Sequence, residues 1–234
     1  MKFHGIKGIF FDVGWTLLSP RYGGWLYNSG TLNKHIDTDL YRSLPEERRN
    51  AAHDLALAYI SDNTRLDTED EEYEMFCSIY RIIADELPEL GLTPGQIDAI
   101  AHDKVYNMEN YIYFDDAIPT LETLRGKYRL GVISDTSPSI KQMLDYGGLT
   151  PYFDTFTYSC AVGVCKPDVR MYADALEKMG LSPSETIFID DIESNLDGAA
   201  DADINPVHIT YKPGTIPSGK YPVISKISEL LKLL

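Results

Sequence analysis

The sequence predicts an α/β protein with a doubly wound parallel sheet and an inserted all-helical domain. Two observations lead to this expectation. In both terminal parts of the chain, short apolar runs alternate with segments of helical pattern, which is typical of such a sheet. Between these parts lies a long stretch with several helix signals and no convincing strand. We therefore expect a core built from residues 1–18 and 114–234, with a helical domain at residues 19–113.

Three apolar runs, each with a polar residue at its end or one residue before it, are the expected strands. They cover residues 6–13, 128–134 and 186–190. Runs this apolar are typical of parallel strands, which are buried on both faces. The helical segments around them cover residues 118–126, 137–147, 168–180 and 195–202. Ligands of such sheets bind outside the carboxyl ends of the strands. The residues at those ends, Asp12, Ser134 and the pair Asp190–Asp191, therefore mark the candidate site.

Capping signals predict helices in the insert. The spacing of a capping box, Ser or Thr followed three residues later by Glu or Gln, begins at Ser43, Thr68 and Thr93. Large side chains recur at helical spacing after Thr68, and we expect them to pack between helices rather than bind a ligand. They are Tyr73, Phe76, Tyr80, Ile83 and Leu87.

Composition narrows the classes of partner. The chain has 234 residues, 44% of them hydrophobic and 24% charged, with a net charge of −15. A surface this negative repels nucleic acids and anionic membranes, so we expect neither as a partner. An anionic substrate would need a metal ion or a buried cation to reverse the local field. Three cysteines without metal-binding spacing, and no apolar run of membrane-spanning length, predict a cytoplasmic protein. Nothing in the sequence predicts its oligomeric state.

Four short motifs occur in order along the chain. They are Phe10-Phe11-Asp12-Val13-Gly14-Trp15-Thr16-Leu17, then Ser134 after an apolar strand, then Gly163-Val164-Cys165-Lys166-Pro167-Asp168, and then Phe188-Ile189-Asp190-Asp191-Ile192-Glu193-Ser194-Asn195. In this order and spacing they resemble the haloacid dehalogenase-like hydrolases, and the resemblance covers essentially the whole chain. It implies a Rossmann-like core, with the helical insert as a cap domain between the first and second motifs.

The resemblance also implies a set of roles. Asp12 would be the nucleophile, and Ser134 and Lys166 would complete the catalytic group. Mg²⁺ would be bound by Asp12, Asp191 and the backbone carbonyl of Gly14, with Asp190 as a direct or an indirect ligand. The substrate-binding residues would be Ser134, Asp135, Lys166 and Asn195. The residue types fit these roles, because Mg²⁺ prefers hard oxygen ligands and two adjacent carboxylates repel each other without a cation.

Each residue also has a simpler interpretation. Asp12 could cap a strand end, and Ser134 could form a hydroxyl-stabilised turn. Lys166 could be an exposed turn lysine. The five histidines, His4, His35, His53, His102 and His208, show no metal-ligand spacing and are expected on the surface or in structural positions.

The sequence departs from the family pattern at two positions. Phosphatases of this family carry a second aspartate two residues after the nucleophile, which protonates the leaving alcohol, and here that residue is Gly14. A backbone carbonyl can still bind the metal, but glycine cannot donate the proton. The second departure is Asp203, at a place where glycine is usual.

These observations predict a hydrolase, and most specifically a Mg²⁺-dependent phosphatase for a small phosphorylated metabolite, with activity weakened or made selective by Gly14. Two alternatives stay open. One is a dehalogenase or C–P hydrolase using the same aspartate, although the insert offers no recognisable halide-binding arginine and only Lys34 and Lys104 as lysines. The other is a non-catalytic binding protein on the same scaffold.

Overall fold

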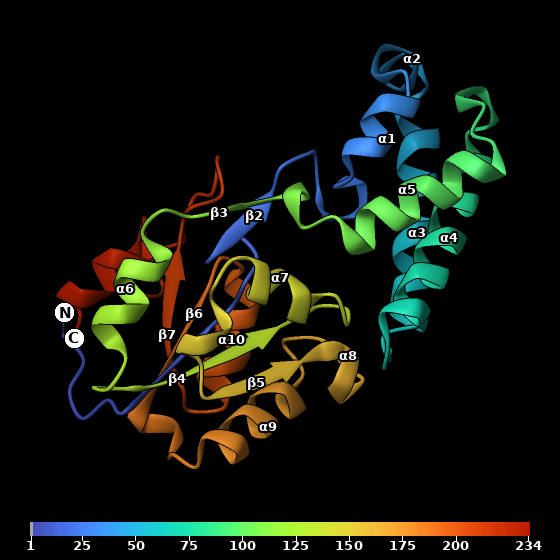
Figure 1. The fold of residues 1–234 in the computed structure, drawn as a ribbon. Helices are drawn as coiled ribbons and strands as arrows, with labels where there is room; N and C mark the ends of the chain where they lie inside the picture. Colours follow the sequence, from blue (N-terminus) through green and yellow to red (C-terminus); the bar gives the residue numbers. More distant parts are fainter. Residues whose placement is uncertain (1) are drawn as a thin grey trace. The chain divides into compact units, whose positions relative to one another are not determined.

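The structure is a computed structural model that describes residues 2–234 (Figure 1). Six strands form a sheet in the order β5-β4-β1-β6-β7-β8, and neighbouring strands run parallel. The strands are β1 (Gly8–Phe11), β4 (Arg129–Ser134), β5 (Thr155–Tyr158), β6 (Thr186–Asp190), β7 (Asn205–Ile209) and β8 (Val223–Ile224). The expected α/β fold with a parallel sheet is confirmed.

Helices cover both faces of this sheet. They are α6 (Ala117–Leu124), α7 (Ile140–Tyr146), α8 (Ser159–Val162), α9 (Val169–Met179) and α10 (Glu193–Asp201). The chain moves outward from β1 through β4 to β5, and then returns to β6 on the other side of β1. Because crossovers between parallel strands are right-handed, this reversal places α6 and α7 on one face and α9 and α10 on the other (Figure 1). The direction in which the chain adds successive strands thus reverses beside β1.

A compact apolar layer joins the sheet to α9 and α10. Phe10 and Phe188 are fully buried in it against Tyr172 of α9. Burying side chains of this size stabilises the fold by about 1.5–3 kcal/mol each. Gly131 of β4 permits the close packing here, because a Cβ atom at this position would lie 2.8 Å from both Phe10 and Met179.

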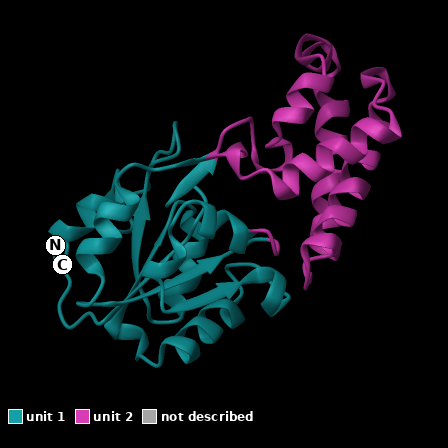
Figure 2. Cartoon of the chain, viewed as in Figure 1, with its two compact units in different colours: residues 1–19, 112–136, 140–234 teal, residues 20–111, 137–139 magenta. Residues whose placement is uncertain are grey.

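The structure divides into two compact units (Figure 2). Unit 2 comprises Pro20–Tyr111 and Ser137–Ser139, and unit 1 holds the sheet and the rest of the chain. The insert was expected at residues 19–113, without the segment Ser137–Ser139. The helices of unit 2 are α1 (Gly30–His35), α2 (Thr38–Ser43), α3 (Glu46–Asp62), α4 (Glu69–Glu86) and α5 (Pro94–Tyr106).

Two of the three capping boxes predicted in the insert are present. Thr68 and Thr93 each form a complete capping box at the start of α4 and α5. The box expected at Ser43 does not form, because Ser43 ends α2, where its hydroxyl donates to the carbonyl of Leu40 at 2.7 Å. Helix α3 instead follows Pro45. The large side chains of α4 and the residue after it pack in the core of unit 2, with Tyr73 partly buried and the others buried: Phe76, Tyr80, Ile83 and Leu87.

Two short strands at the boundaries of the insert were not expected. They are β2 (Leu18–Pro20) and β3 (Tyr111–Tyr113), which pair in a two-stranded sheet. Segments of three residues are too short for a strand periodicity to be recognised.

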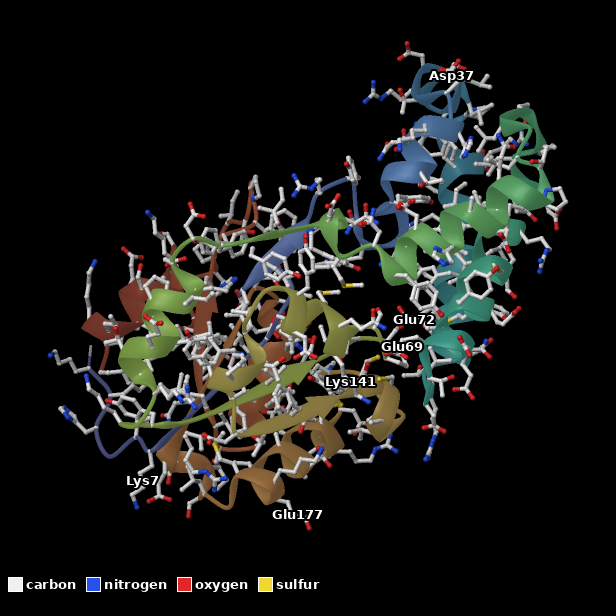
Figure 3. All side chains as sticks on the ribbon, in the orientation of Figure 1. Lys7, Asp37, Glu69, Glu72, Lys141 and Glu177 are labelled. Atoms are coloured by element: carbon white, nitrogen blue, oxygen red, sulfur yellow. The ribbon has the colours of Figure 1, made fainter. Side chains whose placement is uncertain are left out.

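The surface of each unit carries charged side chains, as Figure 3 shows for Lys7, Asp37 and Glu177. Within residues 2–234, no helix is both long enough and apolar enough to cross a membrane.

Candidate active site

The parallel register brings the polar ends of three strands together. Asp12 follows the last residue of β1, and its N–H donates to the carbonyl of Ile189 in β6 at 2.9 Å. Asp190 ends β6 one residue later, and Ser134 ends β4 on the other side of β1. All three side chains lie at the carboxyl edge of the sheet, beside the reversal of strand order, where α/β folds bind ligands.

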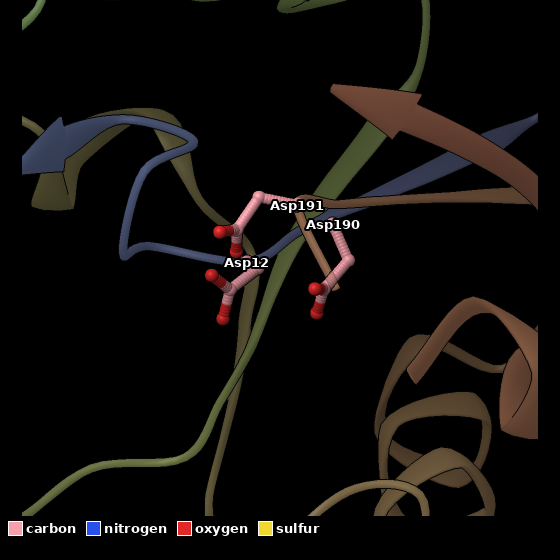
Figure 4. Close-up of side chains that lie close together, drawn as sticks. All are labelled: Asp12, Asp190 and Asp191. Atoms are coloured by element: carbon pink, nitrogen blue, oxygen red, sulfur yellow. The ribbon is translucent and has the colours of Figure 1, made fainter. Parts of the chain in front are cut away.

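Three carboxylates form an acidic group at this edge (Figure 4). One carboxylate oxygen from each of Asp12, Asp190 and Asp191 lies within 4.8 Å of the others. Asp12 is 7% exposed and Asp190 is fully buried. Like charges held this close in a buried place repel strongly unless a cation joins them.

Lys166 supplies one such cation. Its Nζ donates to Asp12 Oδ1 and to Asp190 Oδ2, both at 2.7 Å, and lies 3.3 Å from the carbonyl oxygen of Ile133. Its side chain is only 2% exposed. Burial alone would lower the pKa of Lys166, but the negative charges of Asp12 and Asp190 outweigh it and raise the pKa above its ordinary value. The ammonium therefore stays charged between the two carboxylates.

The loop that carries Lys166 is held by Asp135. The backbone N–H of Lys166 donates to Asp135 Oδ1 at 2.8 Å. Asp135 was expected among the substrate-binding residues, and in the structure one of its oxygens orients the lysine loop. Ser134, the residue before it, is 4% exposed.

One lysine does not balance the acidic group. Three carboxylates against one ammonium leave an excess of two negative charges. Burial raises the pKa of Asp12 well above its ordinary value, with Lys166 opposing and Asp190 adding to the rise. Burial and the charge of Asp190 also raise the pKa of Asp191, to about 6. A divalent cation has the charge that this cluster lacks, and carboxylates are the donors that Mg²⁺ prefers.

Asn195 is directed at Asp190. Its Nδ2 donates to both carboxylate oxygens of Asp190, at 3.2 and 3.1 Å. Asp190 Oδ1 also accepts from the N–H of Ile192 at 2.7 Å, and Oδ2 accepts from Lys166. Both oxygens of Asp190 are thus engaged by the protein. This arrangement favours a role for Asp190 in holding Lys166 in place. Asn195 then acts on Asp190 rather than on a substrate.

Helix α10, which carries Asn195, packs closely against the lysine loop. Gly198 in this helix permits the contact, because a Cβ atom there would lie 2.7 Å from Pro167 Cβ and 2.8 Å from its carbonyl oxygen. At the end of the same segment, Asp203 has a positive φ of 60°. This left-handed conformation explains why glycine is the usual residue at that position.

The loop after Asp12 turns tightly. The carbonyl of Val13 accepts from the N–H of Leu17 at 2.9 Å, and Trp15 has a positive φ of 55°. Gly14 lies between Val13 and Trp15 and has no side chain to donate a proton.

His208 also contacts the acidic edge, which the sequence did not predict. This histidine of β7 is 4% exposed, and its Nε2 lies 3.2 Å from the backbone oxygen of Asp191. From the sequence, His208 was expected on the surface or in a structural position, because the histidines show no metal-ligand spacing. It lies opposite Asp190 in the β6–β7 register, a placement that no local sequence signal records.

A family model described as haloacid dehalogenase-like hydrolase matches residues 6–203. This chain belongs to that family. As a haloacid dehalogenase-like hydrolase it is an enzyme, and the similarity predicted from its four motifs is confirmed.

Individual relatives of this hydrolase carry several activities in their names. It is 29% identical over 189 residues to a glyceraldehyde 3-phosphate phosphatase of Methanothermobacter thermautotrophicus, covering 79% of this chain and 76% of that protein. It is 29% identical over 123 residues to the pyrimidine 5'-nucleotidase YjjG of Escherichia coli, covering 50% of this chain and 55% of that protein. The alignment spans only about half the length of several such relatives.

Solved structures show the same fold. A crystal structure of a dehalogenase superposes with a TM-score of 0.70 at 18% identity, covering 99% of this chain and 98% of that one. At this identity the likeness concerns the fold alone. The proteins named here thus include a phosphatase, a nucleotidase and a dehalogenase, and the reaction of this hydrolase must be argued from its site.

Proposed function

We propose that this hydrolase is a Mg²⁺-dependent phosphatase that acts on a small phosphorylated metabolite through an aspartyl-phosphate intermediate on Asp12. The observation that carries the proposal is the charge of the site. The carboxylates of Asp12, Asp190 and Asp191 exceed the single ammonium of Lys166 by two charges. A phosphate monoester is itself a dianion and needs such a site to be occupied by a divalent ion before it can approach. The relatives named as a phosphatase and a nucleotidase support the same reaction class.

Asp12 is the proposed nucleophile. Lys166 engages its Oδ1, so that Oδ2 is the oxygen left to attack phosphorus. The new Oδ2–P bond forms as the bond from phosphorus to the leaving oxygen breaks. A water molecule then attacks the phosphorus of the aspartyl phosphate, which releases inorganic phosphate and restores the carboxylate. Held at 2.7 Å, the ammonium of Lys166 also offsets the charge that develops on the phosphoryl oxygens.

The remaining predicted residues are assigned by their contacts. Asp12, Asp191 and the Gly14 carbonyl would hold Mg²⁺, which when bound neutralises the phosphate charge. Asp190 would anchor Lys166, because both of its oxygens already accept hydrogen bonds. Ser134 would donate to a phosphate oxygen from the end of β4. Asp135 and Asn195 would support the site through Lys166 and Asp190, rather than contact the substrate as the sequence analysis expected.

A turnover assay distinguishes this proposal from its alternatives. We expect release of p-nitrophenol from p-nitrophenyl phosphate that stops when the metal is chelated and resumes when Mg²⁺ is restored. Halide release from a haloacid with no requirement for metal would instead identify a dehalogenase, whose neutral carbon–halogen bond needs no divalent ion. Cleavage of a phosphonate but not of phosphate esters would identify a C–P hydrolase. Absence of phosphate release in the presence of Mg²⁺ would overturn the phosphatase proposal.

Metal binding itself is expected to stabilise the fold. The unfolded chain has no such site, so Mg²⁺ at 100 times its dissociation constant should add about 2.7 kcal/mol to the free energy of unfolding. Thermal unfolding with and without Mg²⁺ measures this effect. Asp191→Asn, which removes one carboxylate of the group, should lose most of the Mg²⁺-dependent shift. An equal rise in unfolding temperature in the parent and in this variant would show that the ion binds elsewhere.

A further inference from the structure

The peptide unit that joins Asp191 to Ile192 is held at both of its polar atoms. Its N–H donates to Asp190 Oδ1 at 2.7 Å, and its carbonyl oxygen lies 3.2 Å from His208 Nε2. Because a carbonyl oxygen can only accept, Nε2 must carry the proton in this contact. A peptide unit is planar, so a hydrogen bond on each side fixes the orientation of the whole plane.

This plane determines where the side chain of Asp191 points. Strand β6 fixes the backbone before Asp191, and the held peptide fixes the backbone after it. With both neighbours fixed, the direction of the Cα–Cβ bond of Asp191 is set. Free rotation here would let Asp191 turn away from the like charges of Asp12 and Asp190, which lie within 4.8 Å. The hydrogen bond from His208 opposes that movement.

His208 is buried within the sheet. It lies in β7, directly opposite Asp190 in the parallel register, and is 4% exposed. Its Nδ1 lies 3.9 Å from Glu193 Oε2. Glu193 in turn accepts from the hydroxyl of Ser218 at 2.6 Å and from its N–H at 3.4 Å. The ring therefore lies between the carbonyl of Asp191 and a carboxylate that the loop at Ser218 orients.

We propose that His208 is a positioning residue for the metal site, which acts by donating a hydrogen bond to the backbone carbonyl of Asp191. It binds neither metal nor substrate. It keeps the Asp191 carboxylate aimed at the ion before the ion arrives, so that no binding free energy is spent on turning it. This inference rests on the proposed function, because it requires that Asp191 bind a divalent cation. Groups that orient metal ligands in this way typically contribute about 10- to 100-fold to metal affinity.

The test uses a matched pair of amide substitutions. In His208→Gln the amide nitrogen reaches about as far as Nε2, whereas in His208→Asn it is one methylene shorter and cannot reach the Asp191 carbonyl. The dissociation constant of Mg²⁺ is measured from unfolding temperature against Mg²⁺ concentration, without any substrate. We expect His208→Gln to bind Mg²⁺ within about threefold of the parent, and His208→Asn to bind about 10- to 100-fold more weakly.

A control variant separates a loss of positioning at Asp191 from a general loss of stability. Val207→Ala removes two methyl groups from the fully buried neighbour of His208 in the same strand, without touching the contact to Asp191. It should lower the unfolding temperature and leave the Mg²⁺ affinity unchanged.

Three outcomes would overturn the proposal. They are equal affinities in the Gln and Asn variants, Asn affinity equal to that of the parent, and an equally large loss of affinity in Val207→Ala. The failure of the proposed function looks different, because in that case the parent protein itself shows no Mg²⁺-dependent shift.

Discussion

Asp12→Asn is expected to reduce phosphatase turnover by at least about 10³-fold, because an amide is a very poor nucleophile toward phosphorus. The fold should survive the change. Asn is nearly the same size as Asp, and Lys166 keeps its 2.7 Å contact with Asp190. Burial raises the pKa of Asp12, which means that the buried negative charge is costly. Removing it should therefore leave the unfolding temperature of the metal-free protein unchanged or slightly higher.

The measurement is kcat with an aryl phosphate, alongside thermal unfolding of the same sample. Asp145→Asn serves as a matched control, since it makes the same chemical change on the exposed side of α7. It should retain the activity of the parent. Turnover of Asp12→Asn within tenfold of the parent would mean that another group attacks phosphorus.

Gly14 predicts an unusual selectivity among substrates. Aryl phosphates, acyl phosphates and anhydrides release stabilised anions and need little protonation. Alkyl phosphates release alkoxides, which need a proton in the transition state, and Gly14 has no side chain to give one. We therefore expect p-nitrophenyl phosphate to be cleaved far faster than simple alkyl monoesters. The logarithm of kcat/KM should fall steeply as the pKa of the leaving alcohol rises.

The substitution Gly14→Asp tests the cause of that selectivity. A carboxyl group there should flatten the dependence on leaving-group pKa and raise alkyl-ester turnover, by up to about 10²- to 10⁴-fold if it acts fully as an acid. Gly14→Asn, of the same size but unable to donate a proton as an acid does, is the control. A flat dependence in the parent would show that another residue already supplies the proton.

The candidate site could be located from the sequence because it lies at strand ends. An apolar run that ends in Asp12 or Asp190 shows both a buried strand and its carboxyl edge, and parallel strands bring those edges together. The strands β5, β7 and β8 were not recognised. The short sequences Thr155–Tyr158 and Asn205–Ile209 contain too many polar residues, or a proline, to stand out as buried runs.

The sequence by itself determined the fold class, the family and the acidic edge of this protein, since these depend on local apolar patterns and on the order of four motifs. Only the tertiary structure decided what each polar side chain touches. Lys166 contacts Asp12, which is 154 residues away in the sequence. Asn195 donates to Asp190, and His208 Nε2 lies 3.2 Å from the backbone oxygen of Asp191. Such contacts follow from strand register and helix packing, which place distant residues within hydrogen-bonding distance in a way that no local spacing records.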